Sequence, residues 1–131
     1  MKQPNIKVYT RGQWLGHELK WAVLAMLRQN AREVERGEAP LPFLNAYRLQ
    51  SLTGCNYGSL RTLLKKWSTG KNKVIDRKKW GGLYVYTITA RGHVNFELLT
   101  NGYLSRRHGK WVQVNAKAVL RRLPVYQKYL A

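Results

Sequence analysis

The sequence predicts an α+β fold in a single domain. An apolar stripe with helical spacing runs through residues 57–67. Further on, Gly81 and Gly82 separate two runs rich in β-branched and aromatic residues, which is the pattern of a hairpin with a two-residue turn. The chain has 131 residues, 44% of them hydrophobic, and no linker divides it. We therefore expect one domain over residues 1–131.

A long N-terminal helix is expected over residues 10–37. Residues 10–13 fit a capping box, so the helix should begin near residue 11, and Gly37 should end it. Trp14 and Trp21 lie half a turn from the main apolar stripe and make the apolar face broad. Because so broad a face can hold a second subunit, we expect a homodimer, formed through this helix or the C-terminal segment.

Two shorter helices should follow, joined by a glycine turn. Asn45 can cap the first, over residues 46–52, and Asn56 can cap the second, over residues 57–67. Gly54 between them can adopt the positive φ that ends the first helix. Two helices joined by a short Gly-containing turn are a helix-turn-helix. The outer face of the second helix is small and cationic, with no carboxylate to neutralise it.

A hairpin over residues 74–89 is expected next. A turn at the two glycines pairs Trp80 with Leu83 and, at the other end, Ile75 with Ile88. Its basic residues lie near the tip, so the hairpin should project positive charge outward.

The last third of the chain should add a helix and an extension. Thr89 can cap the helix, which we expect to stop at Asn101 and Gly102. The extension, residues 102–131, should contain a second hairpin around residues 108–109 and a final helix over residues 116–123. In the helix that follows Thr89, we expect Val94, Leu98 and Leu99 to pack inward.

The net charge of +18, from 24 Lys and Arg against 6 Asp and Glu, exceeds what solubility requires and implies a polyanionic partner. Nucleic acid is the first candidate. Residues 1–38 hold 7 basic and 4 acidic side chains, whereas residues 39–131 hold 17 and 2. The polyanion-binding surface should therefore lie after the first helix.

The supply of catalytic groups is poor. The three histidines, His17, His93 and His108, belong to different elements at spacings that match no zinc site. Asp76 is the only aspartate, and no glycine-rich phosphate loop precedes a helix. We therefore expect a binding protein, not an enzyme, with no catalytic residue, metal, cofactor or small-molecule ligand.

Cysteine usage and hydropathy point to the cytoplasm. Cys55 is the only cysteine, so no intrachain disulfide can form, and we expect a small buried turn residue there. The longest apolar run, residues 21–27, is too short to span a bilayer, and no signal peptide is evident. We expect an intracellular, nucleoid-associated protein that does not bind a membrane.

The order helix, helix, turn, basic helix and hairpin, ending in YVYTITARG, resembles the winged helix-turn-helix across residues 44–99. It is similar to small transcription regulators of bacteria, archaea and archaeal viruses. The resemblance implies that the second helix of LTGCNYGSLRTLLKKW lies in the DNA major groove and that the hairpin, or wing, contacts the backbone or minor groove. Gln50 departs from the family, which usually has a small residue there. Residues 1–42 and 102–131 match only as extra elements.

This resemblance implies a protein that reads the sequence of double-stranded DNA, and we predict a transcriptional regulator. The residues expected to contact nucleic acid lie on the two short helices, in the following turn and in the hairpin. They are Arg48, Asn56, Tyr57, Gly58, Ser59, Arg61, Thr62, Lys65, Lys66, Lys71, Lys73, Arg77, Lys78, Lys79 and Trp80.

Two other kinds of binding protein stay open. Winged-helix folds also occur in ribosomal and protein-interaction subunits, so the fold does not determine the function. An RNA-binding or ribonucleoprotein role and a non-specific architectural role on nucleic acid are therefore alternatives. Stacking of single-stranded bases is an alternative use of the aromatic residues, with Trp80 beside its basic neighbours as the best candidate. Trp80 could instead cover the base of the wing, and Tyr57 could be half core and half contact.

Overall fold

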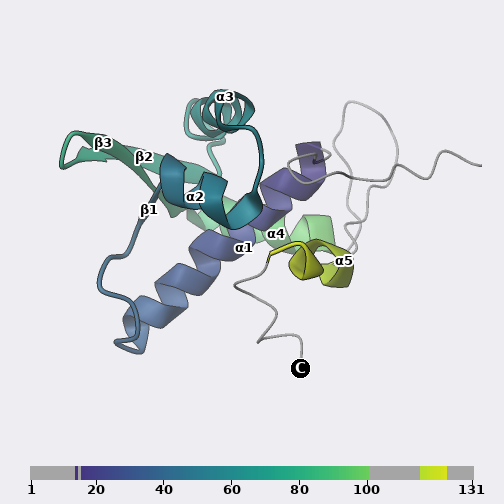
Figure 1. Ribbon diagram of the computed structural model, residues 1–131, viewed down its shortest axis with the longest axis horizontal. Coiled ribbons are helices and arrows are strands. Elements are labelled where there is room, and N and C mark those ends of the chain that lie inside the picture. Colours follow the sequence, from purple (N-terminus) through teal and green to yellow (C-terminus); the bar gives the residue numbers. More distant parts are fainter. Residues whose placement is uncertain (1–13, 15, 101–115, 124–131) are drawn as a thin grey trace, which may run out of the picture.

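The computed structural model describes Trp14, residues 16–100 and residues 116–123. Within these ranges the chain forms helices and one three-stranded antiparallel sheet, which confirms the α+β class (Figure 1). The elements are α1 (Gly16–Glu35), β1 (Leu44–Asn45), α2 (Ala46–Thr53), α3 (Tyr57–Trp67), β2 (Ile75–Trp80), β3 (Leu83–Ile88), α4 (Ala90–Thr100) and α5 (Ala116–Arg121). The predicted capping box at residues 10–13 and the second hairpin lie outside the described residues.

The long helix α1 forms the centre of the core. Every residue from Trp21 to Leu27 is buried, and α1 contacts α2, β3, α4 and α5. Its predicted end is confirmed, since Gly37 has φ +74° just after it. Trp21 is only 3% exposed because Phe96 of α4 stacks on its ring at 4.8 Å. Its indole N–H also donates to the Thr100 hydroxyl (2.8 Å). The Trp21 ring is therefore covered within the chain itself and is not available to a second subunit.

The helices α2 and α3 begin and end almost as predicted, because their caps are local. The Asn45 side chain accepts a hydrogen bond from the Arg48 backbone N–H (2.8 Å), and Asn56 accepts one from that of Ser59 (3.0 Å). Gly54 has φ +69°, the left-handed conformation that ends α2. The predicted range of α3 is confirmed at both ends, and α2 is one residue longer than expected.

The turn between α2 and α3 is stabilised by hydrogen bonds from polar side chains. Gln50 Nε2 donates to the Cys55 carbonyl oxygen (3.3 Å), so the residue that departs from the winged-helix pattern spans the turn. The hydroxyl of Thr53, itself buried, donates to the Leu49 carbonyl oxygen (2.8 Å). Cys55 is 3% exposed, as predicted, and burial raises the pKa of its thiol.

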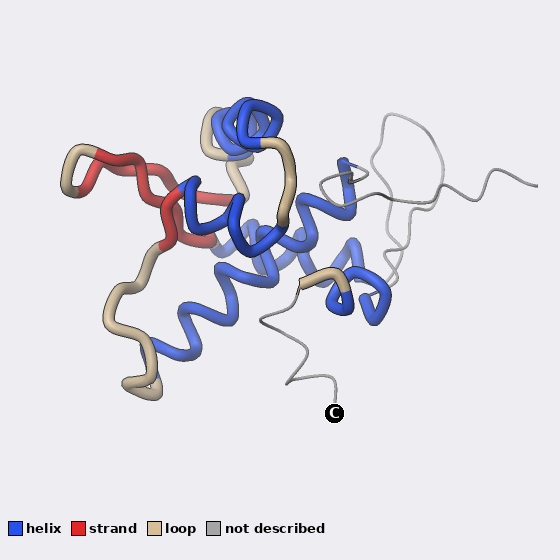
Figure 2. The backbone as a smooth tube through the Cα atoms, in the orientation of Figure 1, coloured by secondary structure: helices blue, strands red, loops and turns tan. Residues whose placement is uncertain are grey.

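The β2–β3 hairpin has the predicted register, with Ile75 opposite Ile88 and Trp80 opposite Leu83. The two glycines between the strands have φ +59° and +82°, the positive values that such a tight turn needs. The strands occupy one side of the domain, and the far end of the hairpin projects beyond the helices (Figure 2). The hairpin therefore offers exposed surface on both of its faces near the tip.

The sequence did not predict strand β1. Leu44 pairs with Tyr86 and Asn45 pairs with Val85, so the sheet order is β1-β3-β2. Two residues are too few to show the alternation that reveals a strand. The pairing brings the start of α2, which follows β1 directly, against the hairpin.

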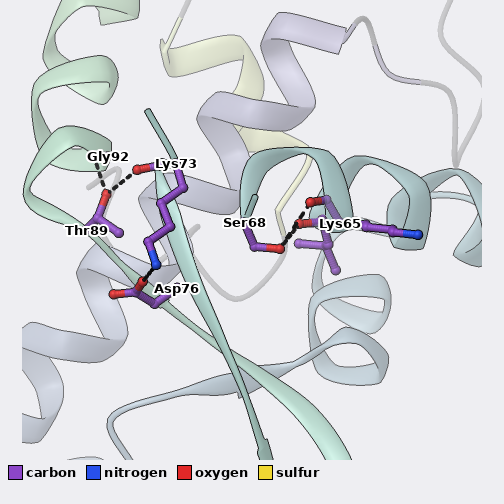
Figure 3. Close-up of polar contacts among 7 residues, drawn as sticks. Lys65, Ser68, Lys73, Asp76, Thr89 and Gly92 are labelled. Atoms are coloured by element: carbon purple, nitrogen blue, oxygen red, sulfur yellow. Dashed lines mark hydrogen bonds and ion pairs between the residues drawn. The ribbon is translucent and has the colours of Figure 1, made fainter. Parts of the chain in front are cut away.

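The helix α4 begins as predicted, at a Thr89 cap that also ties it to the hairpin. The Thr89 hydroxyl accepts from the Gly92 N–H (3.0 Å) and donates to the Lys73 carbonyl oxygen (2.9 Å; Figure 3). Gly92 is buried against the backbone of Val74. This close approach decides which side of α4 faces the core.

The prediction that Val94 and Leu98 pack inward is wrong. They are 57% and 38% exposed. At about 100° per residue they lie on the side of the helix opposite Gly92. Phe96 and Leu99 lie on the same side as Gly92 and pack against the core. The steric requirement at Gly92 therefore rotates the helix away from the orientation that its apolar residues alone suggested.

The last described helix, α5, ends two residues before the predicted position. Val119 and Leu123 are nonetheless fully buried in the common core. The Arg122 guanidinium lies 3.7 Å from the centre of the Trp14 ring, which links α5 to the residues before α1. In the part of the chain that the structure describes, no helix combines the length and apolar character needed to cross a bilayer.

Candidate nucleic-acid interface

One side of α3 is buried and the other is exposed, as the apolar stripe predicted. Leu60, Leu64 and Trp67 enter the core. The opposite side is exposed and carries Gly58, Thr62 and Lys65 at its centre. The Thr62 hydroxyl donates to the Gly58 carbonyl oxygen (3.1 Å), so it can still accept a hydrogen bond from a ligand.

The other polar residues of α3 divide between its two flanks. Arg61 lies on the flank that faces the hairpin, where it lines a cleft with Tyr84 and Tyr86. Lys66 is on the other flank, near α1. Burial, together with the Lys66 charge, lowers the pKa of the Lys20 ammonium. The predicted contact residues therefore share one helix but do not all face one direction.

Alternation along β2 separates its cations onto two faces. Lys78 and Trp80 share one face and meet Phe43: the Lys78 ammonium is 5.2 Å from the centre of the Phe43 ring, and the Trp80 ring is 5.1 Å from it. Arg77 and Lys79 lie on the other face, which is turned toward α3. Only this second pair can act together with α3.

The exposed aromatic ring of that second face is Tyr84. It is 42% exposed, and the Arg77 guanidinium lies 4.4 Å from its ring centre. The Lys79 ammonium lies 5.4 Å from the same centre. Such contacts between a cation and an aromatic ring hold flexible side chains near the surface without neutralising them.

Two adjoining clefts separate α3 from the hairpin. The first, of about 200 Å³, is rich in tyrosine and is lined by Asn45, Ala46, Tyr47, Tyr57, Arg61, Gly82, Leu83, Tyr84 and Tyr86. The second, of about 270 Å³, is rich in cations and is lined by Gly58, Arg61, Thr62, Lys65, Arg77, Tyr84 and Tyr86. The two clefts share Arg61, Tyr84 and Tyr86, so they form one continuous surface.

Sequence reasoning missed three tyrosines of this surface, Tyr47, Tyr84 and Tyr86. The Tyr47 ring stacks on Tyr57 at 4.9 Å with 9° between the planes, and the hydrogen bond to Tyr47 raises the pKa of Tyr57. The correctly predicted hairpin register could have revealed two of them, because it places Tyr86 opposite Arg77 and Tyr84 opposite Lys79. No local pattern pointed to Tyr47.

Trp80 is half exposed and lies outside both of these clefts. It lines a third hollow, of about 320 Å³, with Arg48 and Leu83 among its neighbours. Its contact with Phe43 agrees with a covering role, and its exposure leaves room for a ligand. Arg48 is therefore also directed to the side of the hairpin away from the α3 clefts.

Carboxylates compete little for the cations of this interface. Asp76 and Glu97 are the only acidic side chains after Glu38 in the sequence. Asp76 pairs with Lys73 (2.8 Å; Figure 3), and Glu97 pairs with Arg28 of α1 (2.9 Å). Of the predicted contacts, Lys73 is thus already partnered, which weakens its attraction for a polyanion.

Among the described residues, no group of three or more His, Cys, Asp and Glu side chains could hold a metal ion. Searches against known protein families, curated proteins and solved structures find no match to this chain. The function must therefore be inferred from the chemistry of the surface itself.

Proposed function

We propose that this protein is a winged helix-turn-helix regulator that binds double-stranded DNA and reads its sequence. In this proposal α2 and α3 are the helix-turn-helix, α3 enters the major groove, and the β2–β3 hairpin is the wing on the backbone or minor groove. The observation that carries the proposal is the cationic surface shared by α3 and the adjoining face of the hairpin.

The charges on this surface favour phosphate as the ligand. Arg61, Lys65, Arg77 and Lys79 are contributed by two elements that converge on the same clefts or their rim. Among the described residues none of these four forms an ion pair with a carboxylate. Cations without carboxylate partners at a protein surface are the usual means of neutralising nucleic-acid phosphates.

The shape of α3 favours a duplex with an open major groove. Gly58 and Thr62 are small, so the centre of the exposed face can approach a groove floor closely. The major groove of B-DNA admits an α-helix, whereas that of A-form RNA is too deep and narrow for side chains to read. We therefore expect duplex DNA to be preferred over duplex RNA.

The tyrosine cleft beside α3 favours a second candidate, a protein that binds single-stranded DNA or RNA. Exposed aromatic rings beside cations stack unpaired bases. Competition titrations with duplex DNA, single-stranded DNA and duplex RNA of one sequence distinguish the two candidates. Tighter binding of the duplex DNA supports our proposal, and equal or tighter binding of single strands contradicts it.

A regulator should also select particular sequences. Selection of bound molecules from random duplexes should give a defined motif. A pool with no common motif would instead indicate an architectural protein or an RNA-binding role. A homodimer stays a prediction, although Trp21 no longer supports it; the molar mass from light scattering, measured with and without DNA, tests it.

A further inference from the structure

The two clefts beside α3 differ in chemistry in a way that matches the two halves of a nucleotide. Tyr47 and Tyr57 line only the first cleft, whereas Lys65 and Arg77 line only the second. A nucleobase offers a flat π-face that stacks on aromatic rings, and its phosphate is an anion that guanidinium groups bind. From this arrangement we infer that the joined clefts bind one unpaired nucleotide, with its base against the tyrosines and its phosphate against Arg61 and Arg77.

Geometry supports the phosphate end of this site. Arg61 reaches it from α3 and Arg77 from β2. Both arginines line this cleft together with Tyr86. Burial raises the pKa of Tyr86, and the charges of the two arginines oppose this effect. Neither arginine forms an ion pair within the described ranges. Two cations that converge from separate elements would repel one another less with an anion between them.

The base end is built from rings that the fold already holds in place. Tyr86 is 4% exposed and fixed in the sheet, and Tyr57 is held by its stack on Tyr47. Tyr84 is 42% exposed and lines both clefts, so it marks the boundary between base and phosphate. Rings that are ordered before binding lose little conformational entropy when a base stacks on them.

The inference rests on the proposed binding of nucleic acid and adds a ligand that a fully paired duplex does not present. Such a nucleotide could be a bulged or extruded base in a strand, or a free mononucleotide. The shared chemistry is the unpaired base with its phosphate, and the experiment separates the two sources.

The test compares a short duplex with the same duplex carrying one unpaired adenosine, using fluorescence anisotropy at fixed salt. The bulged duplex should bind about tenfold more tightly, which corresponds to one stacked base. Tyr84→Leu should abolish this difference, and Tyr84→Phe should retain it because the ring remains. Val94→Ala is the control: it truncates an exposed apolar side chain on α4 that lines neither cleft, and it should preserve the ratio of the two affinities. Thermal melts verify that each variant is folded.

Calorimetric titration with adenosine monophosphate identifies the source. Binding that Tyr84→Leu removes would assign the cleft to a free nucleotide, whereas an advantage seen only in the bulged duplex would assign it to a nucleotide within a strand. If the paired duplex binds but neither the bulge nor the mononucleotide adds affinity, this inference is wrong and the proposed function stands. A bulge advantage that persists in Tyr84→Leu also overturns the inference. If the paired duplex does not bind, the proposed function fails. Binding of the mononucleotide would then still support the cleft as a nucleotide site, and its absence would overturn the inference as well.

Discussion

A Cβ atom on Gly92 would lie 2.1 Å from the carbonyl oxygen of Val74. Real Cβ atoms do not approach backbone oxygens so closely, so α4 and the start of the hairpin can pack as they do only with glycine at this position. Gly92→Ala should therefore lower the free energy of unfolding by about 1–3 kcal/mol, as overpacking does. Thermal or urea unfolding measures the effect.

Gly16→Ala is the control for this substitution. Gly16 is also helical, but a Cβ there would meet no atom within 4 Å. We expect its free energy of unfolding to stay within about 0.5 kcal/mol of the parent value. A Gly92→Ala protein as stable as the Gly16→Ala protein would show that α4 can move away from Val74 at little cost.

Arg61→Ala should lower the affinity for the selected DNA sequence without lowering the affinity for random DNA. In the proposed complex with a fully paired duplex, where the cleft beside α3 holds no unpaired nucleotide, Arg61 can pair with the O6 and N7 atoms of a guanine, a contact worth about 1–3 kcal/mol of discrimination. Its loss should weaken binding of the selected DNA site by roughly 10- to 100-fold and change binding of random DNA little. Anisotropy titrations with both duplexes measure this, and equal losses on both would assign Arg61 to phosphate contact.

Lys79→Ala should weaken both duplexes alike. Lys79 lies near the hairpin tip with its ammonium over Tyr84, where a flexible cation meets phosphates and not base edges. The dependence of log affinity on log salt should become shallower by about one unit. Titrations at several salt concentrations measure the slope, and a loss confined to the selected site would make the hairpin the reader of sequence.

Asp76→Asn should strengthen binding to DNA. The Asp76 carboxylate pairs with Lys73 (2.8 Å) and adds a negative charge beside the cationic hairpin. Its removal frees the Lys73 ammonium for a phosphate, so the salt slope should steepen by about one unit.

In the parent protein Lys71→Ala should cost more affinity than Lys73→Ala, because Lys71 has no carboxylate partner among the described residues. Equal losses would mean that the ion pair opens at no cost.

His93 should make folding stability depend on pH. Partial burial and the charges of Arg28 and Arg32 lower the pKa of its imidazole. Since the folded state binds the proton less readily than the unfolded state, stability should fall as pH decreases below the ordinary histidine value of about 6.5 and level off below the lowered pKa. His93→Gln should reduce this decline between pH 7 and pH 5 in urea unfolding experiments. A parallel decline in both proteins would assign it to the carboxylates.

The parts of the structure that were predicted correctly are those whose causes lie within a few residues of one another. Asn45 and Asn56 cap their helices through backbone groups three residues away. The two-residue turn sets the register of the hairpin by itself. The cationic face of α3 follows in the same way from helical spacing. Local hydrogen bonding and local periodicity can be predicted from a sequence without knowledge of the fold.

The parts that were missed or wrong depend on contacts between distant residues. The apolar pattern of α4 suggested Val94 and Leu98 for the core, but Gly92 and its contact with Val74 turned them outward. The spacing of α1 left Trp21 available to a second subunit, but Phe96, 75 residues later in the chain, stacks on it. Strand β1 exists only because β3 supplies its partner.

The sequence by itself thus determined the helix caps, the hairpin register, the excess of positive charge and the basic helix that carries part of it. Only the tertiary structure decided that Tyr47 and Tyr57 meet Tyr84 across a cleft, that Arg61 converges with Arg77, and that Lys73 is already paired. The reason is physical: caps and turns depend on the backbone of near neighbours, whereas a binding surface depends on how separately folded elements pack, and that packing is set by burial and steric fit across the whole domain.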